Sequence, residues 1–129
     1  MNSLSLAVTP DNGLTFELIV DEKPISHWLI DGNEGIPYWI VDEGLPTWPP
    51  HTAPQAETQR IVSVCGCGEY GCGHSRCTVR TEGETVVFEG FAGDAKGTGR
   101  TARFVFPREQ YESVCKAISQ QRSSYRDDA

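Results

Sequence analysis

The stretch ARFVFPREQYESVCKAI, residues 102–118, decides the fold because it joins a predicted strand to the clearest predicted helix of the chain. Residues 102–106 favour a short strand, and Pro107 suits the first turn of a helix, where a missing N–H loses no hydrogen bond. Four apolar or weakly polar residues then recur at helical spacing. They are Tyr111, Val114, Cys115 and Ile118. The sequence therefore predicts an amphipathic helix over residues 107–121 that packs on a sheet.

Upstream, residues 1–43 are predicted to form an acidic meander of short strands. Apolar and polar residues alternate at 4–8 and again at 14–20, and the turn-forming sequence PDNG separates the two runs. A second turn sequence, DEKP, leads into a predicted strand at 25–30, and a glycine-containing polar stretch precedes another at 37–41. Short connections of this kind favour antiparallel neighbours.

The middle of the chain adds an irregular connection and further strands. Residues 44–59 hold four of the eight prolines and are predicted to be an extended Pro-rich loop. Residues 60–106 are predicted to supply strands around a glycine- and cysteine-rich loop, including a hairpin that turns at Glu82-Gly83. Residues 1–129 are thus expected to form a single α+β domain, a mostly antiparallel β-sheet of short strands with one C-terminal helix packed on it.

Composition excludes several classes of protein. The formal net charge is −7, whereas nucleic-acid-binding proteins need a surplus of Lys and Arg, so no nucleic-acid partner is expected. No apolar run is long enough to cross a membrane, and no basic and apolar leader stands at the N-terminus. Five cysteines without such a leader favour a cytoplasmic protein with reduced thiols.

The negative charge is concentrated on the N-terminal side. Residues 1–50 hold eight acidic residues and one lysine, whereas residues 51–129 hold ten residues of each sign. Tryptophans lie among these carboxylates, and aromatic groups beside acidic groups are typical of surfaces that bind basic proteins. The candidate binding residues are Trp28, Asp31, Glu34, Trp39, Asp42, Glu43 and Trp48. The alternative is that the aromatic rings fill the core of a small β-rich domain.

Residues 65–77, CGCGEYGCGHSRC, hold four thiols and one imidazole among glycines that let the chain fold back on itself. Such a loop can bring tetrahedral ligands to one zinc ion. The predicted ligands are Cys65, Cys67, Cys72 and Cys77, with His74 as a substitute. The Cys-x2-Cys spacing of common zinc knuckles is absent, so packed thiols or a disulfide are the alternatives. Cys115, on the apolar side of the predicted helix, is expected to be a small core residue.

Two functions fit these features. The first is a non-enzymatic interaction protein that binds a basic macromolecular partner, with the cysteine loop as a zinc-binding structural clamp. A toxin-neutralising immunity protein is its most concrete version, because acidic surfaces steer and block cationic nucleases. The alternative is a thiol- or metal-dependent enzyme or redox sensor centred on residues 65–77, with Cys72 or Cys77 as nucleophile and His74 as base. That alternative requires a thiol with a lowered pKa.

The loop sequence CGCGEYGC is followed by the predicted hairpin, by Phe104-Val105-Phe106 and by a helix that carries Gln110-Tyr111. This order over residues 61–121 resembles a group of uncharacterised small bacterial proteins, in which a Cys-x-Cys-Gly-Glu-x-Gly-Cys loop precedes a β-hairpin and a Phe-x-Phe segment runs into a Gln-Tyr helix. The resemblance implies no activity and no catalytic residues. Cys65, Cys67, Glu69 and Cys72 match its pattern, whereas His74 and Cys77 lie outside it.

Overall fold

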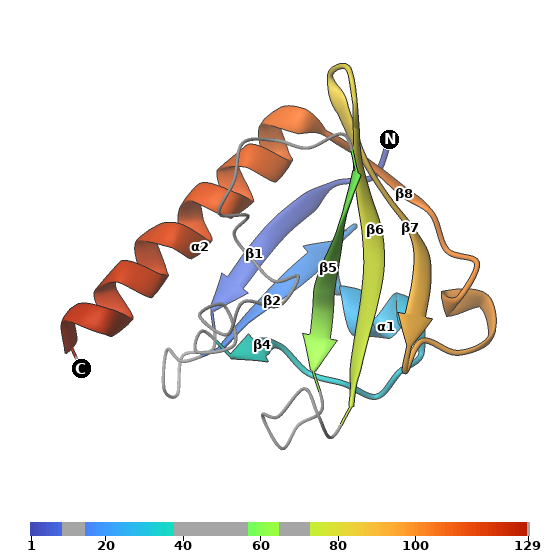
Figure 1. Cartoon of the computed structure of the whole chain (residues 1–129), viewed down its shortest axis with the longest axis horizontal. Coiled ribbons are helices and arrows are strands. Elements are labelled where there is room, and N and C mark those ends of the chain that lie inside the picture. Colours follow the sequence, from blue (N-terminus) through green and yellow to red (C-terminus); the bar gives the residue numbers. More distant parts are fainter. Residues whose placement is uncertain (9–14, 38–56, 65–72, 129) are drawn as a thin grey trace.

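The computed structural model describes residues 1–8, 15–37, 57–64 and 73–128, which form two β-sheets and two α-helices (Figure 1). The first sheet contains β1 (Leu4–Val8), β2 (Thr15–Val20), β3 (Lys23–Pro24) and β4 (Ile36–Pro37). The second contains β5 (Glu57–Val64), β6 (His74–Glu82), β7 (Thr85–Gly93) and β8 (Phe104–Pro107). The helices are α1 (Ile25–Leu29) and α2 (Arg108–Asp128), and a short 3-10 turn, η2, spans Gly97–Gly99.

The first sheet is built around β2, because β1, β3 and β4 all pair with it in antiparallel orientation. Pairing with β1 runs from Leu4 opposite Val20 to Val8 opposite Phe16. The side chains of Phe16, Leu18 and Val20 are fully buried, while their neighbours in the strand are half-exposed. The two-residue alternation predicted for this run is therefore confirmed, and it directs one face of β2 into the core.

The second sheet is an antiparallel succession of β5, β6, β7 and β8. The hairpin predicted around Glu82-Gly83 is confirmed as the connection between β6 and β7. Its register shifts between Arg76 and Thr78, and a β-bulge of this kind bends and twists the strands that carry it. The sheet consequently curls around the core.

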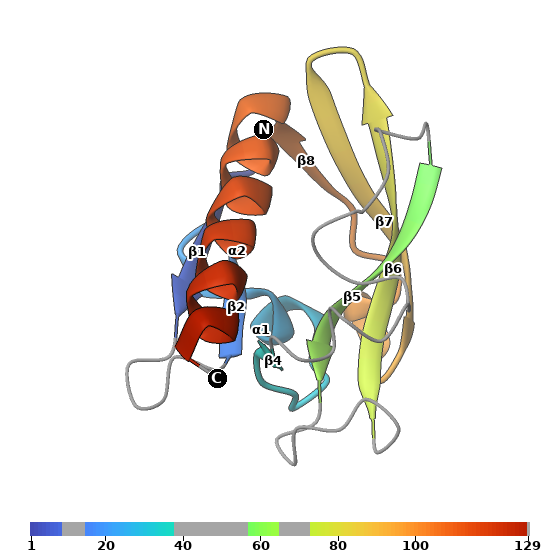
Figure 2. The same cartoon turned by 60° about the vertical axis from the view of Figure 1, so that its left-hand side comes forward.

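Helix α2 packs against β1, β7 and β8 (Figure 2). Val114 and Ile118 are buried together with Phe106, as the helical spacing predicts. The α+β class, with mostly antiparallel strands and one main helix near the C-terminus, is thus confirmed. Some boundaries differ from prediction: the helix continues to Asp128, Pro107 closes β8 instead of starting the helix, and β5 begins at Glu57, inside the predicted Pro-rich loop 44–59.

The strand predicted at residues 25–30 is wrong, because this segment forms the short helix α1. Ile25 and Leu29 lie one helical turn apart and are both buried, while His27 between them is exposed. A strand would direct His27 to the same face as Ile25 and Leu29, whereas a helix keeps it in solvent. The Trp28 indole N–H donates to the Val20 carbonyl oxygen at 2.9 Å, which ties α1 to β2.

Ile30 ends α1 in the left-handed conformation, with φ at 55°, and its side chain is 53% exposed. A β-branched residue is strained there, and glycine is the residue that usually occupies this position. We expect Ile30→Gly to raise the free energy of unfolding by about 1 kcal/mol in urea titrations. Ile30→Ala keeps a Cβ at the same φ, so it should raise the free energy of unfolding by less than Ile30→Gly does. An equal gain in both variants would assign the effect to lost apolar exposure instead of backbone strain.

Candidate functional site

The end of β5 and the start of β6 lie side by side, and the segment after α1 crosses them. Val64 pairs with His74 in the β5–β6 register. The Glu34 N–H donates to the Val64 carbonyl oxygen at 2.9 Å, and the Val64 N–H donates to the Glu34 carbonyl oxygen at 3.3 Å. In the sequence, the cysteine-rich segment 65–72 begins directly after Val64 and ends directly before Gly73. This junction therefore carries both ends of the segment that holds the predicted metal ligands.

Asp31 is a buried carboxylate that joins three parts of the junction. Its Oδ2 atom accepts hydrogen bonds from the hydroxyls of Ser63, at 2.6 Å, and Ser75, at 2.7 Å. Its Oδ1 atom accepts the backbone N–H of Asn33 at 2.9 Å. Ser63 on β5 and Ser75 on β6 are themselves fully buried. Three donors offset the cost of taking the carboxylate out of water, and the shared acceptor holds the two strands to the end of α1.

Asn33 extends this network toward the connection after β7. Its side-chain amide nitrogen lies 3.1 Å from Asp94 Oδ2, and the backbone N–H of Asp94 donates to the His74 carbonyl oxygen at 2.9 Å. Gly73 has no room for a side chain, because a Cβ there would lie 2.5 Å from Asp94 Oδ2. Four separate segments of the chain therefore meet where residue 73 joins the sheet.

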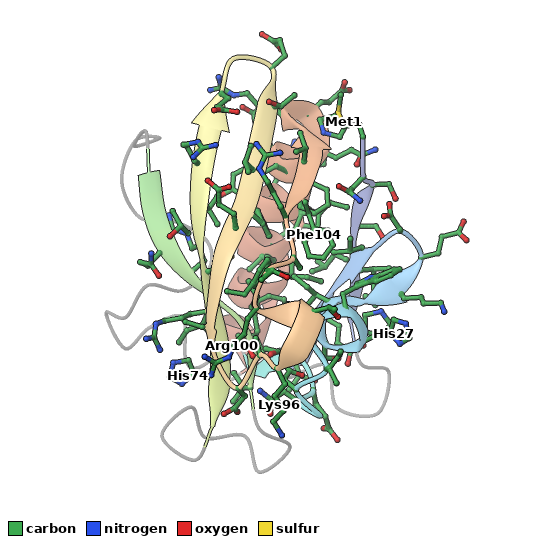
Figure 3. The ribbon with its side chains drawn as sticks, turned by 90° about the vertical axis from the view of Figure 1, so that its right-hand side faces the viewer. Met1, His27, His74, Lys96, Arg100 and Phe104 are labelled. Carbon is green, nitrogen blue, oxygen red and sulfur yellow. The ribbon has the colours of Figure 1, made fainter. Side chains whose placement is uncertain are left out.

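The structure separates the two predicted zinc ligands that it describes. Cys65, Cys67 and Cys72 lie outside the described residues. His74 and Cys77 are both on β6, but Cys77 is buried, whereas the His74 side chain lies on the outer face of the sheet (Figure 3). The exposed Arg76 lies beside His74, with its Nη1 atom 3.5 Å from His74 Nε2. Positions three residues apart along a strand are separated by about 10 Å. Cys77 is part of the hydrophobic core, which removes it from the predicted set of zinc ligands.

The thiols of Cys77 and Cys115 have raised pKa values. Burial raises the pKa of Cys77, and the nearby charge of Arg60 opposes this only in part. Burial also raises the pKa of Cys115 to about 11, against the opposing effects of a hydrogen bond with Tyr111 and of Arg60. Nucleophilic and redox-sensing cysteines need the opposite shift, toward the thiolate. Neither thiol has the property that the enzyme alternative requires.

We therefore expect iodoacetamide to label Cys77 and Cys115 slowly in the native protein at neutral pH, because only the thiolate reacts. Labelling of Cys115 should accelerate as the pH approaches its pKa of about 11, where the thiolate becomes abundant. Mass spectrometry of peptides labelled before and after unfolding in urea measures both rates. Fast labelling of Cys77 in the folded protein would contradict its complete burial.

Three of the predicted partner-binding residues lie in the part of the chain that the structure describes. Trp28 packs against the core and donates to Val20, and Asp31 is the centre of the buried network, so both serve the fold. Glu34 has an exposed side chain and is the one of the three that a partner can reach. Trp39, Asp42, Glu43 and Trp48 lie outside the described residues.

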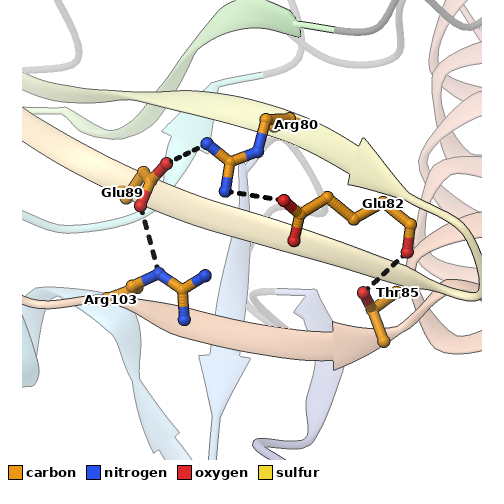
Figure 4. Close-up of polar contacts among 5 residues, drawn as sticks. All are labelled: Arg80, Glu82, Thr85, Glu89 and Arg103. Atoms are coloured by element: carbon orange, nitrogen blue, oxygen red, sulfur yellow. Dashed lines mark hydrogen bonds and ion pairs between the residues drawn. The ribbon is translucent and has the colours of Figure 1, made fainter.

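The charges of the second sheet and α2 compensate one another. Four ion pairs occur among the described residues, and all of them lie beyond residue 79. They join Arg80 to Glu82 and Glu89, Arg103 to Glu89, and Arg108 to Glu112; Figure 4 shows those on the sheet. Arginines thus neutralise Glu82, Glu89 and Glu112, whereas Glu84, Asp94 and Glu109 belong to no ion pair among the described residues.

Glu17 and Glu34 lie beside each other at one narrow surface hollow, which is lined also by Leu18, residues 24–26 and Val62 and is too small to admit a water molecule. Among the described residues, no cationic side chain lines this hollow and neither carboxylate belongs to an ion pair. Gly35 packs closely on Glu17, since a Cβ at Gly35 would lie 3.0 Å from Glu17 Cγ. The sequence prediction missed Glu17, although its polar position between the buried Phe16 and Leu18 marks it as directed away from the core.

Within residues 1–8, 15–37, 57–64 and 73–128, no group of three or more His, Cys, Asp or Glu side chains is placed to hold a metal ion. None of the helices described here is long and apolar enough to cross a membrane. The resemblance of residues 61–121 to small bacterial proteins stays a prediction. No protein-family model, no curated protein and no solved structure matches the chain.

Proposed function

We propose that this protein binds a basic protein partner through the acidic surface of its N-terminal half. The observation that carries the proposal is the adjacency of the Glu17 and Glu34 carboxylates at the hollow, where no cationic side chain lies among the described residues. The carboxylates of the second sheet differ, because Glu82 and Glu89 already contact arginines. Among the described residues, Glu17 and Glu34 are thus two adjacent carboxylates without a cationic partner, and a cationic surface would supply the missing partners.

The physics of this surface favours fast association. Neighbouring carboxylates on a protein with a net charge of −7 create a negative potential that attracts a basic partner before contact. Each exposed ion pair adds at most about 1 kcal/mol, so several contacts must share the binding energy. An immunity protein that blocks a cationic toxin is the most concrete form of the proposal, and it needs no catalytic group.

The test compares two double variants that lose the same charge. Glu17→Gln with Glu34→Gln removes the charge of the hollow while keeping side-chain size, and Glu22→Gln with Glu84→Gln removes two exposed carboxylates that neither line the hollow nor belong to an ion pair among the described residues. Calorimetry with a flexible peptide of alternating lysine and glycine measures the affinity. The hollow variant should bind roughly fivefold more weakly than wild type, and the control within about twofold. Equal losses in both variants would show that only net charge matters and would overturn the proposal.

We also propose that Cys65, Cys67, Cys72 and His74 hold a structural zinc ion that clamps the junction. Two features support this ligand set. Val64 at the end of β5 pairs with His74 at the start of β6, and residues 65–72 lie between these two residues in the sequence. Three thiolates and one imidazole are a common tetrahedral set for zinc.

Native mass spectrometry of protein purified without chelator tests the clamp. Wild type and Cys77→Ala should each carry one zinc ion per chain, whereas His74→Ala should lose zinc at a lower chelator concentration. Zinc-free wild-type protein, or loss of zinc from Cys77→Ala alone, would refute this ligand set. A mass two daltons below that of the reduced chain would indicate a disulfide instead.

A further inference from the structure

A groove of about 560 Å³ runs between strand β1 and helix α2. Residues 4–6 form one wall, and the other wall includes Gln110, Ser113 and Ala117, which follow one another along one face of α2. Figure 2 shows this helix alongside β1, with the second sheet on the other side of the molecule. The groove and the Glu17–Glu34 hollow have no lining residue in common, so they are separate surfaces.

The groove borders a strand edge that already binds a side chain. The backbone N–H of Leu4 donates to the side-chain oxygen of Gln110 at 2.8 Å and so points away from β2. The neighbouring pair, Ser3 and Asp21, is bonded within the sheet instead, because the Asp21 N–H donates to the Ser3 carbonyl oxygen at 3.1 Å. In an antiparallel ladder, such bonded pairs alternate with pairs whose N–H and C=O groups point outward.

The register then fixes which groups of β1 are open. Leu4 is opposite Val20 and Leu6 is opposite Leu18, so both belong to the class of pairs that point outward. The side-chain oxygen of Gln110 already accepts the hydrogen bond from the Leu4 N–H. Among the described residues, the N–H of Leu6 has no such acceptor, and the carbonyl oxygens of Leu4 and Leu6 face the same edge. An unpaired row of donors and acceptors is a template for another strand.

We propose that this groove binds an extended, lysine- or arginine-containing peptide segment of a partner, which adds to β1 as a further strand. The Leu6 N–H donates to the peptide, and the carbonyls of Leu4 and Leu6 accept from it. The charge of the groove selects the class of peptide, because Glu109 lines it and no basic side chain does so among the described residues. Alternate peptide side chains face the wall formed by Ser113 and Ala117, and small residues there leave room for them.

The inference is tested in the wild-type protein with an acetylated and amidated peptide of alternating lysine and valine. Adding this peptide should slow hydrogen exchange of the Leu6 amide about tenfold or more, as followed by NMR. The same peptide with an N-methyl group on every residue cannot donate to the Leu4 and Leu6 carbonyls in any register and should bind about tenfold more weakly. A glutamate–valine peptide should bind more weakly still.

A pair of protein variants locates the site. Ser113→Tyr fills the groove and should weaken binding of the lysine–valine peptide about tenfold, whereas Glu112→Tyr, on another face of the helix, should stay within about twofold of wild type. Neither variant removes a residue of the Glu17–Glu34 hollow, so the result is independent of the proposed function.

Three results would overturn the inference: no binding of the lysine–valine peptide, no protection of the Leu6 amide, or equal binding of the N-methylated or glutamate–valine peptide. If Ser113→Tyr does not fold, the N-methylated peptide still decides the question, because it needs only wild-type protein. If the lysine–valine peptide does not bind at the groove but the double variant of Glu17 and Glu34 weakens binding of the lysine–glycine peptide, the inference about the groove is wrong and the proposed function stands.

Discussion

Asp31→Ala should lower the free energy of unfolding by about 3 kcal/mol, because it strands two buried hydroxyl donors and one backbone N–H at once. The carboxylate accepts from Ser63 and Ser75 at 2.6 and 2.7 Å, and both serine side chains are fully buried. Water cannot replace the lost acceptor without opening the junction between β5, β6 and the end of α1. Urea unfolding followed by tryptophan fluorescence measures the change.

Two variants control for the nature of this loss. Asp31→Asn keeps one acceptor oxygen and should cost less than Asp31→Ala, about 1 kcal/mol. Glu34→Ala removes an exposed carboxylate three residues further along the same segment and should change stability by less than about 0.5 kcal/mol. If Asp31→Ala cost no more than Glu34→Ala, the buried network would not hold the junction together.

Gly93→Ala should be comparably damaging, with a loss of about 3 kcal/mol, because two unfavourable effects coincide at this glycine. Gly93 has φ at +83°, and a Cβ there would meet the carbonyl oxygen of His74, far inside normal contact distance. The methyl group can be accommodated only if β6 and β7 separate beside the junction. Thermal unfolding of the variant measures the loss.

Gly83→Ala separates the two effects. Gly83 also has a positive φ, +59°, but a Cβ there would meet no atom within 4 Å. This variant carries only the backbone strain and should lose about 1 kcal/mol. The excess cost of Gly93→Ala over Gly83→Ala therefore measures the contact with His74, and equal costs would mean that the strands part easily at this point.

Local patterns in the sequence were sufficient for β2, for the hairpin of β6 and β7 and for α2. The alternation around Phe16, Leu18 and Val20 and the helical spacing of Val114 and Ile118 each place apolar groups on one face, so they report directly on burial. The hairpin at Glu82-Gly83 is equally local, since a turn between two apolar runs defines both strands.

Helix α1 could not be predicted in the same way. It has only five residues, the span of a single α-helical hydrogen bond, and short helices are stabilised by packing more than by their own sequence. Ile25 and Leu29 fit both a strand and a helix, and the choice depends on which arrangement leaves His27 in solvent and lets Trp28 reach Val20.

The role of Asp31 depends on contacts across long stretches of sequence. Its hydroxyl partners lie 32 and 44 residues away, so no local pattern distinguishes it from the exposed Glu34. Acidic composition alone assigned both residues to a binding surface, and the structure assigns Asp31 to the fold. Cys77 is similar, because its spacing within residues 65–77 indicated a metal ligand, whereas the alternation of β6 directs it into the core.

The claim that Glu17 and Glu34 attract basic partners is best tested by measuring how the association rate of the lysine–glycine peptide depends on ionic strength. Stopped-flow measurements on wild type should show the rate constant falling steeply as salt approaches 0.1 M, where the screening length is about 10 Å. The variant with Glu17→Gln and Glu34→Gln should associate more slowly at low salt and depend less on salt. A rate that is independent of salt in the wild-type protein, or an identical salt dependence in the variant, would contradict this account.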